Sequence, residues 1–307
     1  MQITDTVLMI RPAAFGYNAE TAQNNFFQKR LNLDAAELQQ KALEQFNGMV
    51  DVLRCHGINV IVIDDTKEPL KPDAIFPNNW FCAHNNLLSV FPMCAQSRRF
   101  EKRDDILKQL ANDFVVDDVH DWSEFEAEAL FLEGTGSMVI DHDHRIIYAC
   151  LSPRTHQSLV QKFAATNNFR AIVFTAHDEN ARLIYHTNVM MCIGEGFAVL
   201  CPKAITDHIE RIAVSQLLET TGHENIYITY EQMKAFAGNM LHLKNDKGEK
   251  FIVLSQTAFN SLDKSQVKKL QNYGTLLPIN VSVIEEVEGG SVRCMMAEIF
   301  LQPKTKA

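Results

Sequence analysis

The sequence predicts an α/β protein of five repeated strand–strand–helix–strand units that close into a ring through the two termini, as a five-bladed propeller. Amphipathic helical stretches alternate with short apolar runs along the whole chain. Four of the helical stretches begin at residues 99, 155, 207 and 263, which are 56, 52 and 56 residues apart. The apolar runs at residues 6–10 and 292–301 complete the fifth unit by pairing with each other, which removes exposed sheet edges.

The first helix shows how each unit is recognised. Residues 34–56 carry apolar side chains at helical spacing, among them Leu38, Phe46 and Leu53, and Gly57 marks the end of the helix. An apolar run at residues 58–63 follows and predicts a strand. A helix followed by a short buried strand is typical of α/β proteins.

The other units repeat this order. Helices are expected at residues 99–112, 155–167, 207–221 and 263–273, followed by strands at 114–116, 171–174, 225–228 and 276–279. Strand hairpins are expected before them at residues 80–91, 138–148, 189–200 and 241–254. The alternative is a generic α/β sheet in which the spacing is accidental. No Pro/Gly/Ser-rich linker divides the chain, so residues 1–307 are expected to form a single domain.

The composition excludes several classes of protein. Of 307 residues, 46% are hydrophobic and 22% charged, and the net charge is −9, which argues against binding to nucleic acid. The sequence has no basic signal-peptide start and no apolar window of membrane-spanning length. Its seven cysteines form no C-x-x-C pair, which favours reduced thiols. We expect a cytoplasmic protein without membrane contact, and a homo-oligomer is compatible with the sequence.

Three residues are candidates for covalent thiol catalysis. Cys294 follows the glycine pair at residues 289–290 and opens an apolar run, while Glu133 and His186 lie near strands of other units. A five-unit ring would bring all three toward one axis, where the thiol could attack and the imidazole could move protons. The alternatives are an inert core cysteine, a hydrogen-bonded loop histidine and an exposed turn acid.

Six short motifs resemble, in order, those of the guanidino-group-modifying enzymes. The motifs are Asp73-Ala74-Ile75-Phe76-Pro77-Asn78-Asn79, Ser97-Arg98-Arg99-Phe100-Glu101, Leu132-Glu133-Gly134, Ser152-Pro153-Arg154-Thr155, His186, and Gly289-Gly290 before Cys294. This superfamily, with the pentein fold, includes arginine deiminases, dimethylarginine dimethylaminohydrolases and amidinotransferases. The resemblance covers nearly the whole chain and looks most like the subgroup associated with citrulline utilisation.

The resemblance implies a five-bladed α/β propeller and a mechanism. Cys294 would attack the central carbon of a guanidino group and form an S-alkylthiouronium. His186 would protonate the departing amine and then activate water, and Glu133 would position the substrate and His186. Asp73, Arg98 and Arg154 match positions that hold the α-amino and α-carboxylate ends of the substrate, and arginine suits a carboxylate through its planar fork.

The departures from the family pattern concern the substrate. Asn78, Asn79 and Asn188 stand where relatives often carry acids, and Gly136 replaces a second acid near Glu133. Burying a guanidinium cation without carboxylates is costly, and neutral amides suit a neutral ureido group at least as well. We therefore expect citrulline or a similar ureido amino acid. The opposing hypothesis is that Glu133, together with one of the acids at positions 285, 286 and 288, suffices for a guanidinium.

No cofactor or metal is expected. The chain lacks the glycine signature of dinucleotide binding. The run Asp141-His142-Asp143-His144 is interpreted as a polar hairpin turn, in preference to a metal site. The expected activity is cysteine-dependent hydrolysis of a C–N bond in a small guanidino or ureido amino acid. An amidinotransferase, in which an amine resolves the intermediate, is the alternative among enzymes, and a non-catalytic propeller that binds a protein partner is the alternative among other classes.

Overall fold

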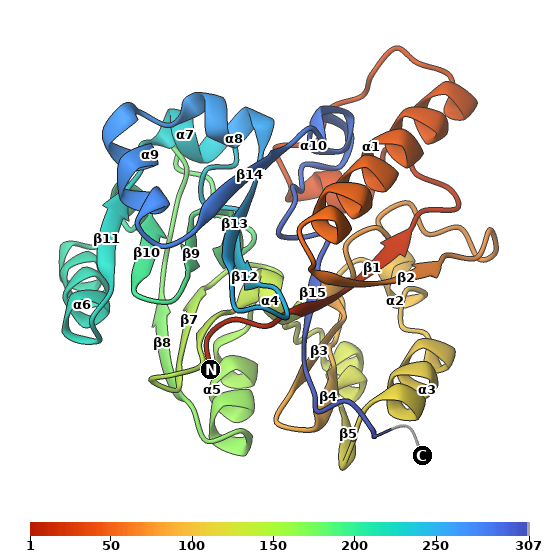
Figure 1. Cartoon of the computed structure of the whole chain (residues 1–307), viewed down its shortest axis with the longest axis horizontal. Coiled ribbons are helices and arrows are strands. Elements are labelled where there is room, and N and C mark those ends of the chain that lie inside the picture. The colour runs from red at the N-terminus through yellow and green to blue at the C-terminus, as the bar shows by residue number, and fades with distance from the viewer. Residues whose placement is uncertain (306–307) are drawn as a thin grey trace.

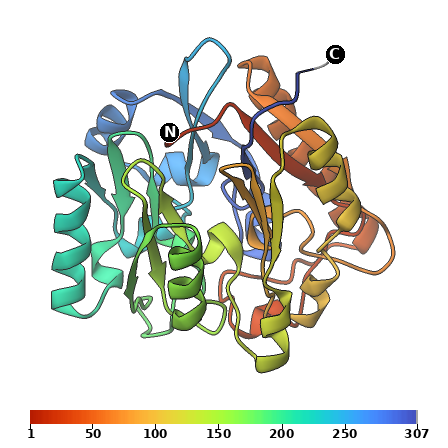
Figure 2. The ribbon, with the colours of Figure 1, turned by 90° about the horizontal axis from the view of Figure 1, so that it is seen from below.

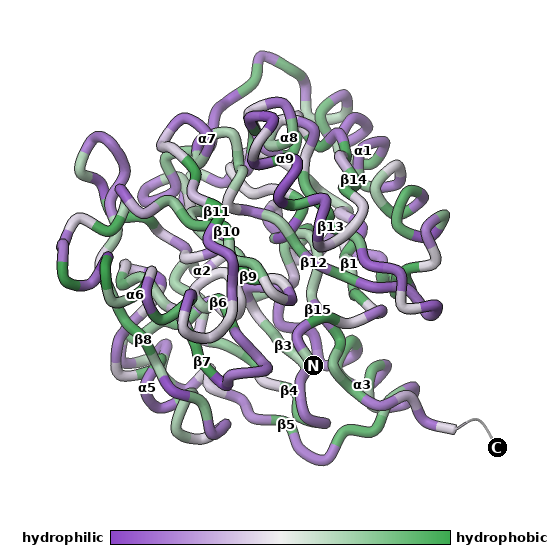
Figure 3. The backbone as a smooth tube through the Cα atoms, turned by 60° about the vertical axis from the view of Figure 1, so that its left-hand side comes forward, coloured by the Kyte–Doolittle hydropathy of each residue, from purple (hydrophilic) through white to green (hydrophobic). Residues whose placement is uncertain are grey.

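The computed structural model describes residues 1–305 and places short sheets at the centre with helices around them (Figures 1 and 2). The first and longest helix, α1 (Ala35–Cys55), and the helix α6 (His208–Thr220) lie at opposite sides of the molecule in Figure 1. Figure 3 shows hydrophobic stretches, in green, along the strands. The arrangement is a mixed α/β fold.

Five units share one strand order. In each unit the first two strands pair antiparallel, and the second and third pair parallel with a helix between them. The units are β15 (Ala297–Phe300), β1 (Thr6–Arg11), α1 and β2 (Asn59–Asp64); β3 (Phe81–His84), β4 (Leu87–Val90), α3 (Asp104–Asp113) and β5 (Asp118–Asp121); β6 (Val139–Asp141), β7 (Ile146–Cys150), α5 (Gln157–Thr166) and β8 (Arg170–Phe174); β9 (Met191–Ile193), β10 (Phe197–Leu200), α6 and β11 (Glu224–Tyr227); and β12 (Leu241–Lys244), β13 (Lys250–Ser255), α9 (Lys264–Gln271) and β14 (Thr275–Ile279).

Short helices connect these elements. The α-helical ones are α2 (Gln96–Arg99), α4 (Gly134–Ser137), α7 (Tyr230–Lys234), α8 (Gln256–Ser261) and α10 (Ser282–Glu288). The 3₁₀ turns are η1 (Thr21–Gln23), η2 (Pro77–Asn79), η3 (Ser123–Glu128), η4 (Thr187–Val189) and η5 (Pro202–Ala204). Among residues 1–305, no helix is long and apolar enough to cross a membrane.

The pairing of the two termini is confirmed. Val7 pairs with Glu298 and Leu8 with Ala297, so the C-terminal strand β15 lies antiparallel to β1. Strand β15 also runs parallel to β3, which joins two units into a six-stranded sheet, while the other units form three separate three-stranded sheets. The hydrogen-bonded strands of residues 1–305 therefore do not form one continuous closed barrel.

Local chemistry explains why α1 begins and ends as predicted. The Asp34 side chain accepts a hydrogen bond from the backbone N–H of Glu37 and so caps the first turn. The apolar stripe, which includes Leu38, Phe46 and Leu53, is buried against the sheet. Gly57 takes the left-handed conformation, with φ of 78°, and turns the chain into β2.

One predicted strand is wrong. Residues 114–116 form no strand, and the third strand of that unit is the polar run β5 (Asp118–Asp121), which pairs with β4. The predicted helix at residues 99–112 is likewise divided into α2 and α3. Phe114, the residue after α3, packs into the core with Leu110 of that helix. The apolar residues that predicted a strand here pack against the core at the end of α3. The strand itself, β5, is polar and is held by hydrogen bonds to β4.

Candidate active site

The candidate residues lie in the turns that precede the first strands of the units. Turn η2 leads into β3, α4 into β6, and η4 into β9. The apolar run from residue 292 was expected to be a strand throughout, but β15 begins only at Ala297. Cys294 therefore lies in a turn, where its N–H bonds the carbonyl oxygen of Ser291 at 2.9 Å.

The Cys294 thiol is buried among amides. Its side chain is 4% exposed. The Asn188 Nδ2 atom lies 3.5 Å from the sulfur, and the Asn239 Nδ2 atom lies 3.3 Å from it. The Asn239 side-chain oxygen, Oδ1, accepts from the backbone N–H of Arg293 at 3.1 Å, which fixes the orientation of the side-chain amide. Two amide N–H groups are thus directed at the sulfur.

Glu133 and His186 form a buried pair. Glu133 precedes α4, His186 precedes η4, and the His186 Nε2 atom lies 2.7 Å from Glu133 Oε2. The second carboxylate oxygen, Oε1, accepts from the backbone N–H of Cys94 at 3.0 Å. Asn188, which contacts the Cys294 sulfur, lies on the turn that begins after His186. The three candidate catalytic residues are thus linked through one short turn.

The electrostatics assign the proton within this pair. Burial acts to raise the pKa of Glu133, but Arg154, the hydrogen bond from His186 and Arg98 outweigh it and lower that pKa to about 2. Burial lowers the pKa of His186 to about 4 although Glu133 opposes the shift. At neutral pH Glu133 is therefore an anion and His186 is neutral. The His186 Nε2–H group donates to the Glu133 carboxylate, and His186 Nδ1 keeps a lone pair.

Gly136 leaves the space in which Nδ1 lies. A Cβ atom at this position would come within 2.8 Å of His186 Nδ1 and 2.3 Å of the Asn79 side-chain amide. A Cβ atom does not approach another heavy atom this closely, so a side chain at this position would displace one of these two groups. The glycine that departs from the family pattern in sequence is therefore required by packing.

Arg98 is bound within the protein. Its Nε and Nη2 atoms each lie 2.8 Å from a carboxylate oxygen of buried Glu101. The third nitrogen, Nη1, lies 4.0 Å from Glu133 Oε2 and 2.8 Å from the Asn79 side-chain oxygen. In this orientation of the Asn79 amide, its oxygen accepts from Arg98 and its nitrogen donates to Asn78 Oδ1. The fork that the sequence analysis assigned to a substrate carboxylate is thus engaged by Glu101. Asn78 lies beside this group, with Nδ2 3.3 Å from Thr135 Oγ1.

Arg154 is held by a segment that covers the site, which we call the covering segment (residues 18–29). The Arg154 Nε atom donates to Asn24 Oδ1 at 2.8 Å, and Nη2 donates to the Thr21 carbonyl oxygen at 2.9 Å. The remaining nitrogen, Nη1, lies 3.5 Å from Glu133 Oε2. In this arrangement the covering segment takes the place of a substrate carboxylate on Arg154.

Two buried acids contact the two ends of the covering segment. Asp73 accepts a hydrogen bond from the Asn18 side chain, and Gln28 donates to Glu288 at 3.3 Å. Burial, and then the neighbouring Asp73 carboxylate, raise the pKa of Glu288 well above its ordinary value. A second oxygen of Glu288, Oε1, is buried without a hydrogen-bond partner among the described residues. This pair of acids suits a cationic group.

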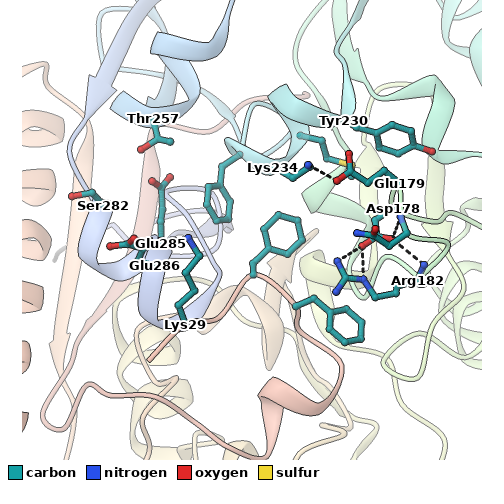
Figure 4. Close-up of a pocket in the computed structure, with 15 residues that line it drawn as sticks. Lys29, Asp178, Glu179, Arg182, Tyr230, Lys234, Thr257, Ser282, Glu285 and Glu286 are labelled. Carbon is teal, nitrogen blue, oxygen red and sulfur yellow. Dashed lines mark hydrogen bonds and ion pairs between the residues drawn. The ribbon is translucent and has the colours of Figure 1, made fainter. Parts of the chain in front are cut away.

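A cavity of about 480 Å³ lies outside the covering segment (Figure 4). Phe27 lines it and packs against Tyr185, which precedes His186, with ring centroids 6.1 Å apart. In Figure 4 the charged residues stand on two sides of the cavity, with Glu285 on one side and Arg182 on the other. The cavity is lined by Phe27 but, within residues 1–305, not by the catalytic candidates. Phe27 therefore lies both at this cavity and against the residue that precedes His186.

Asn239 and Asn24 are not predicted as site residues from the sequence. Asn239 stands two residues before β12, as Asn79 stands two residues before β3, so a comparison of equivalent positions among the units would have identified it. Asn24 lies in a stretch without periodicity, and nothing in the sequence connects it with Arg154. Glu288 was considered only as one of several acids that might complete a guanidinium site, and the structure places it beside Asp73.

Comparison with known families identifies the chain. A family model described as N,N dimethylarginine dimethylhydrolase, eukaryotic, matches residues 11–301. The chain belongs to this family. The dimethylarginine dimethylhydrolase family consists of hydrolases that act on C–N bonds, within the guanidino-modifying superfamily that the sequence motifs predicted. A comparison with curated proteins finds no match.

Several solved structures share the fold of this chain. ArgZ, an arginine dihydrolase from cyanobacteria, is similar with a TM-score of 0.76 and 16% identity, over 97% of this chain and 41% of ArgZ. The chain thus spans less than half the length of ArgZ, whereas it matches 99% of a solved N-terminal domain of ArgZ with a TM-score of 0.74, 16% identity and 96% of this chain covered. A dimethylarginine dimethylaminohydrolase is similar with a TM-score of 0.65 and 15% identity, over 97% of this chain and 99% of that one.

Proposed function

We propose that the chain is a cofactor-independent cysteine hydrolase, formed by residues 1–307 as one catalytic domain, that cleaves a C–N bond of a guanidino or ureido amino acid. The observation that carries the proposal is the contact between the Cys294 sulfur and Asn188, on the turn that follows His186, while Glu133 holds His186. A thiol, a neutral imidazole and an orienting carboxylate are the parts of covalent thiol catalysis. Among the relatives, a cysteine-to-serine variant of ArgZ binds substrate, and a histidine-to-glycine variant of dimethylarginine dimethylaminohydrolase carries an adduct.

In the proposed mechanism the proton moves in one sequence of steps. The His186 Nδ1 lone pair accepts the thiol proton, and Cys294 Sγ attacks the central carbon to form an S–C bond. The protonated imidazole then gives its proton to the leaving nitrogen as the C–N bond breaks. Water, deprotonated by the same nitrogen, attacks the carbon, the S–C bond breaks, and the thiol is restored. Glu133 stays ionised and stabilises the imidazolium in both steps.

The amides around the thiol favour a ureido substrate. The side chains in contact with the Cys294 sulfur are neutral, and Asn188 Oδ1 is buried without a partner among residues 1–305, where it can accept one N–H of a substrate. The Glu133 carboxylate already accepts from His186 and from the backbone N–H of Cys94. The family match favours the second candidate, a guanidino substrate such as a methylated arginine. Both candidates share the same central carbon chemistry.

Recognition of an amino acid is supported at the covering segment. Asp73 and Glu288 suit an α-ammonium group, which would satisfy the unpartnered oxygen of Glu288. Arg154 suits the α-carboxylate once it is released from Thr21 and Asn24. In this proposal Arg98, bound by Glu101, positions Asn79 and Glu133 rather than the substrate.

The five units are proposed to form a propeller around the site. Contacts between their turns run in cyclic order: Gly134 lies against the Asn78 carbonyl oxygen, Gly136 against His186, Gly238 against the Val189 carbonyl oxygen, Asn239 against Cys294, and Gly290 against Phe76. Each contact joins one unit to the next along the chain. The last contact joins the unit of β15 to the unit of β3, from which the first contact starts, so the order is closed. Such an order supports a ring closed by side-chain and turn contacts rather than by a continuous sheet.

A substrate panel tests the proposed activity. Wild type and Cys294→Ser are incubated with arginine, methylated arginines, agmatine and citrulline, and ammonia, methylamine, citrulline, ornithine and urea are measured. We expect turnover by wild type alone and a covalent adduct on Cys294 detectable by mass spectrometry. Turnover that survives Cys294→Ser would remove the proposed nucleophile. Strong turnover of arginine with none of citrulline would instead reject the argument from the amides.

Thiol titration separates the enzyme from a non-catalytic propeller that binds a partner. Cys294 receives two N–H donors, whereas Cys150 is buried in an apolar core cluster. We expect a small alkylating reagent to modify Cys294 faster than Cys150 at neutral pH, because the thiolate is the reactive species. Equal rates at the two positions would favour the non-catalytic alternative.

A further inference from the structure

We propose that Asp141, His144 and His223 bind a divalent transition-metal ion of the Zn²⁺ type, at the junction of the third and fourth units. Asp141 ends β6, His144 lies in the turn before β7, and His223 follows α6 immediately before β11. One ligand atom from each residue lies within 4.8 Å of the other two. Two imidazoles and a carboxylate are typical ligands of zinc and of similar divalent metals.

The charge on Asp141 requires a partner. Its side chain is fully buried, and within residues 1–305 no lysine or arginine nitrogen lies within 4.0 Å of its carboxylate. The groups that face it are the two imidazoles, with His144 Nδ1 at 3.0 Å and His223 Nε2 at 3.8 Å from Oδ2. A buried carboxylate without a cation is costly. A metal ion between the three groups would supply that charge.

His223 is oriented as a metal ligand. Its Nδ1 atom lies 3.0 Å from Thr221 Oγ1 and 3.3 Å from the Leu218 carbonyl oxygen, which suits an N–H donor at that nitrogen. The lone pair is then on Nε2, the atom that faces Asp141. A histidine whose other nitrogen donates to a carbonyl is the usual arrangement around bound metals. Gly222, with φ of 83°, makes the turn that places this ring.

A hairpin turn explains only part of this arrangement. The turn interpretation accounts for the Asp141 Oδ1 atom, which accepts from the His144 backbone N–H at 3.0 Å. It does not explain why both imidazoles face the carboxylate, or why His223 comes from another unit. Tyr148 is a further unexplained group: the strand register places it on the Asp141 side of the hairpin, and its buried hydroxyl has no hydrogen-bond partner among the described residues. His142, by contrast, packs on Phe300 away from this cluster.

The site is open on one side. The His144 side chain is 43% exposed, whereas Asp141 and His223 are buried. Metal can therefore enter past His144 and keep water in its remaining coordination positions. Since the ligands come from two units, binding would tie the β6–β7 hairpin to the α6–β11 turn and stabilise the folded protein.

Binding of Zn²⁺ and Co²⁺ to the chelator-treated full chain tests the proposal. We expect one equivalent by equilibrium dialysis, and a rise of roughly 5 °C in unfolding temperature at a hundredfold excess over Kd. His223→Gln should abolish this binding, and the exposed substitution His144→Ala should weaken it at least tenfold. His208→Ala, which changes an exposed histidine on α6, is the matched control and should bind normally.

The catalytic thiol must be separated from this site, because cysteine and histidine also bind zinc. Cys294→Ser should retain the equivalent of metal, and bound Co²⁺ should lack the absorption of a thiolate complex. Three results would overturn the proposal: no binding to wild type, unchanged binding by both His144→Ala and His223→Gln, or loss of the metal in Cys294→Ser alone. If His223→Gln does not fold, His144→Ala alone decides, since the His144 side chain is partly exposed and its loss should not prevent folding.

Discussion

In the proposed mechanism the carboxylate of Glu133 has a catalytic role, and its buried contacts also stabilise the fold. Glu133→Gln is therefore expected to lower both the turnover number and the stability. The substitution keeps the size of the side chain but removes its charge. His186 then loses the anion that stabilises its imidazolium, and Arg154 Nη1 loses a partner at 3.5 Å. By analogy with other orienting carboxylates, we expect the turnover number to fall roughly a thousandfold or more.

The pKa of Glu133 sets the size of the effect on stability. Its shift from 4.5 to about 2 corresponds to about 3 kcal/mol of folding free energy at pH 7. Because the pKa is lower in the folded state, this stabilisation is present above pH 4.5 and is lost as the pH falls toward 2. At pH 3 roughly half of this stabilisation remains. At neutral pH the variant should therefore unfold roughly 6 °C below wild type.

Urea denaturation at several pH values, together with turnover assays, measures both effects. The difference in unfolding free energy between wild type and Glu133→Gln should shrink by about half between pH 7 and pH 3. Glu126→Gln is a matched control, because Glu126 pairs with Lys102 at 2.6 Å but contacts none of the catalytic candidates. That control should lose stability and keep its turnover number. A pH-independent difference, or turnover of Glu133→Gln within tenfold of wild type, would refute the reasoning.

Three further substitutions examine the surroundings of the thiol. Asn239→Ala removes a donor to the Cys294 sulfur and should slow alkylation of that thiol and lower kcat/KM by roughly 10- to 100-fold, since a bond to a charged group contributes about 1.5–3 kcal/mol. Gly136→Ala places a methyl group 2.8 Å from the buried histidine and should lower kcat roughly a hundredfold, whereas Gly48→Ala, with nothing within 4 Å, should leave kcat unchanged. Asn24→Ala removes a partner of Arg154 in the covering segment and should change KM more than kcat. Initial rates over a range of substrate concentrations measure both constants. A change in kcat alone would contradict a role of Arg154 in binding the substrate.

Elements determined by nearby residues could be predicted from the sequence. The cap at Asp34, the buried stripe of α1 and the left-handed Gly57 all act within a few residues of one another, so a single stretch of sequence contains the whole cause. The same holds for the hairpins, where alternating apolar residues meet polar turns. The repeat of these units predicted the pairing of β1 with β15, because only that pairing completes the fifth unit.

Tertiary structure alone decided the contacts between distant residues. Phe114 is buried in the core just after α3, and only the sheet shows that the strand β5 follows later. Similarly, Asn239 contacts Cys294 across 55 positions. His223 meets Asp141 between two units, although neither stretch carries a metal-binding spacing by itself. Side-chain chemistry and local structure are encoded in short segments, whereas the distance between two functional groups depends on how every unit between them packs.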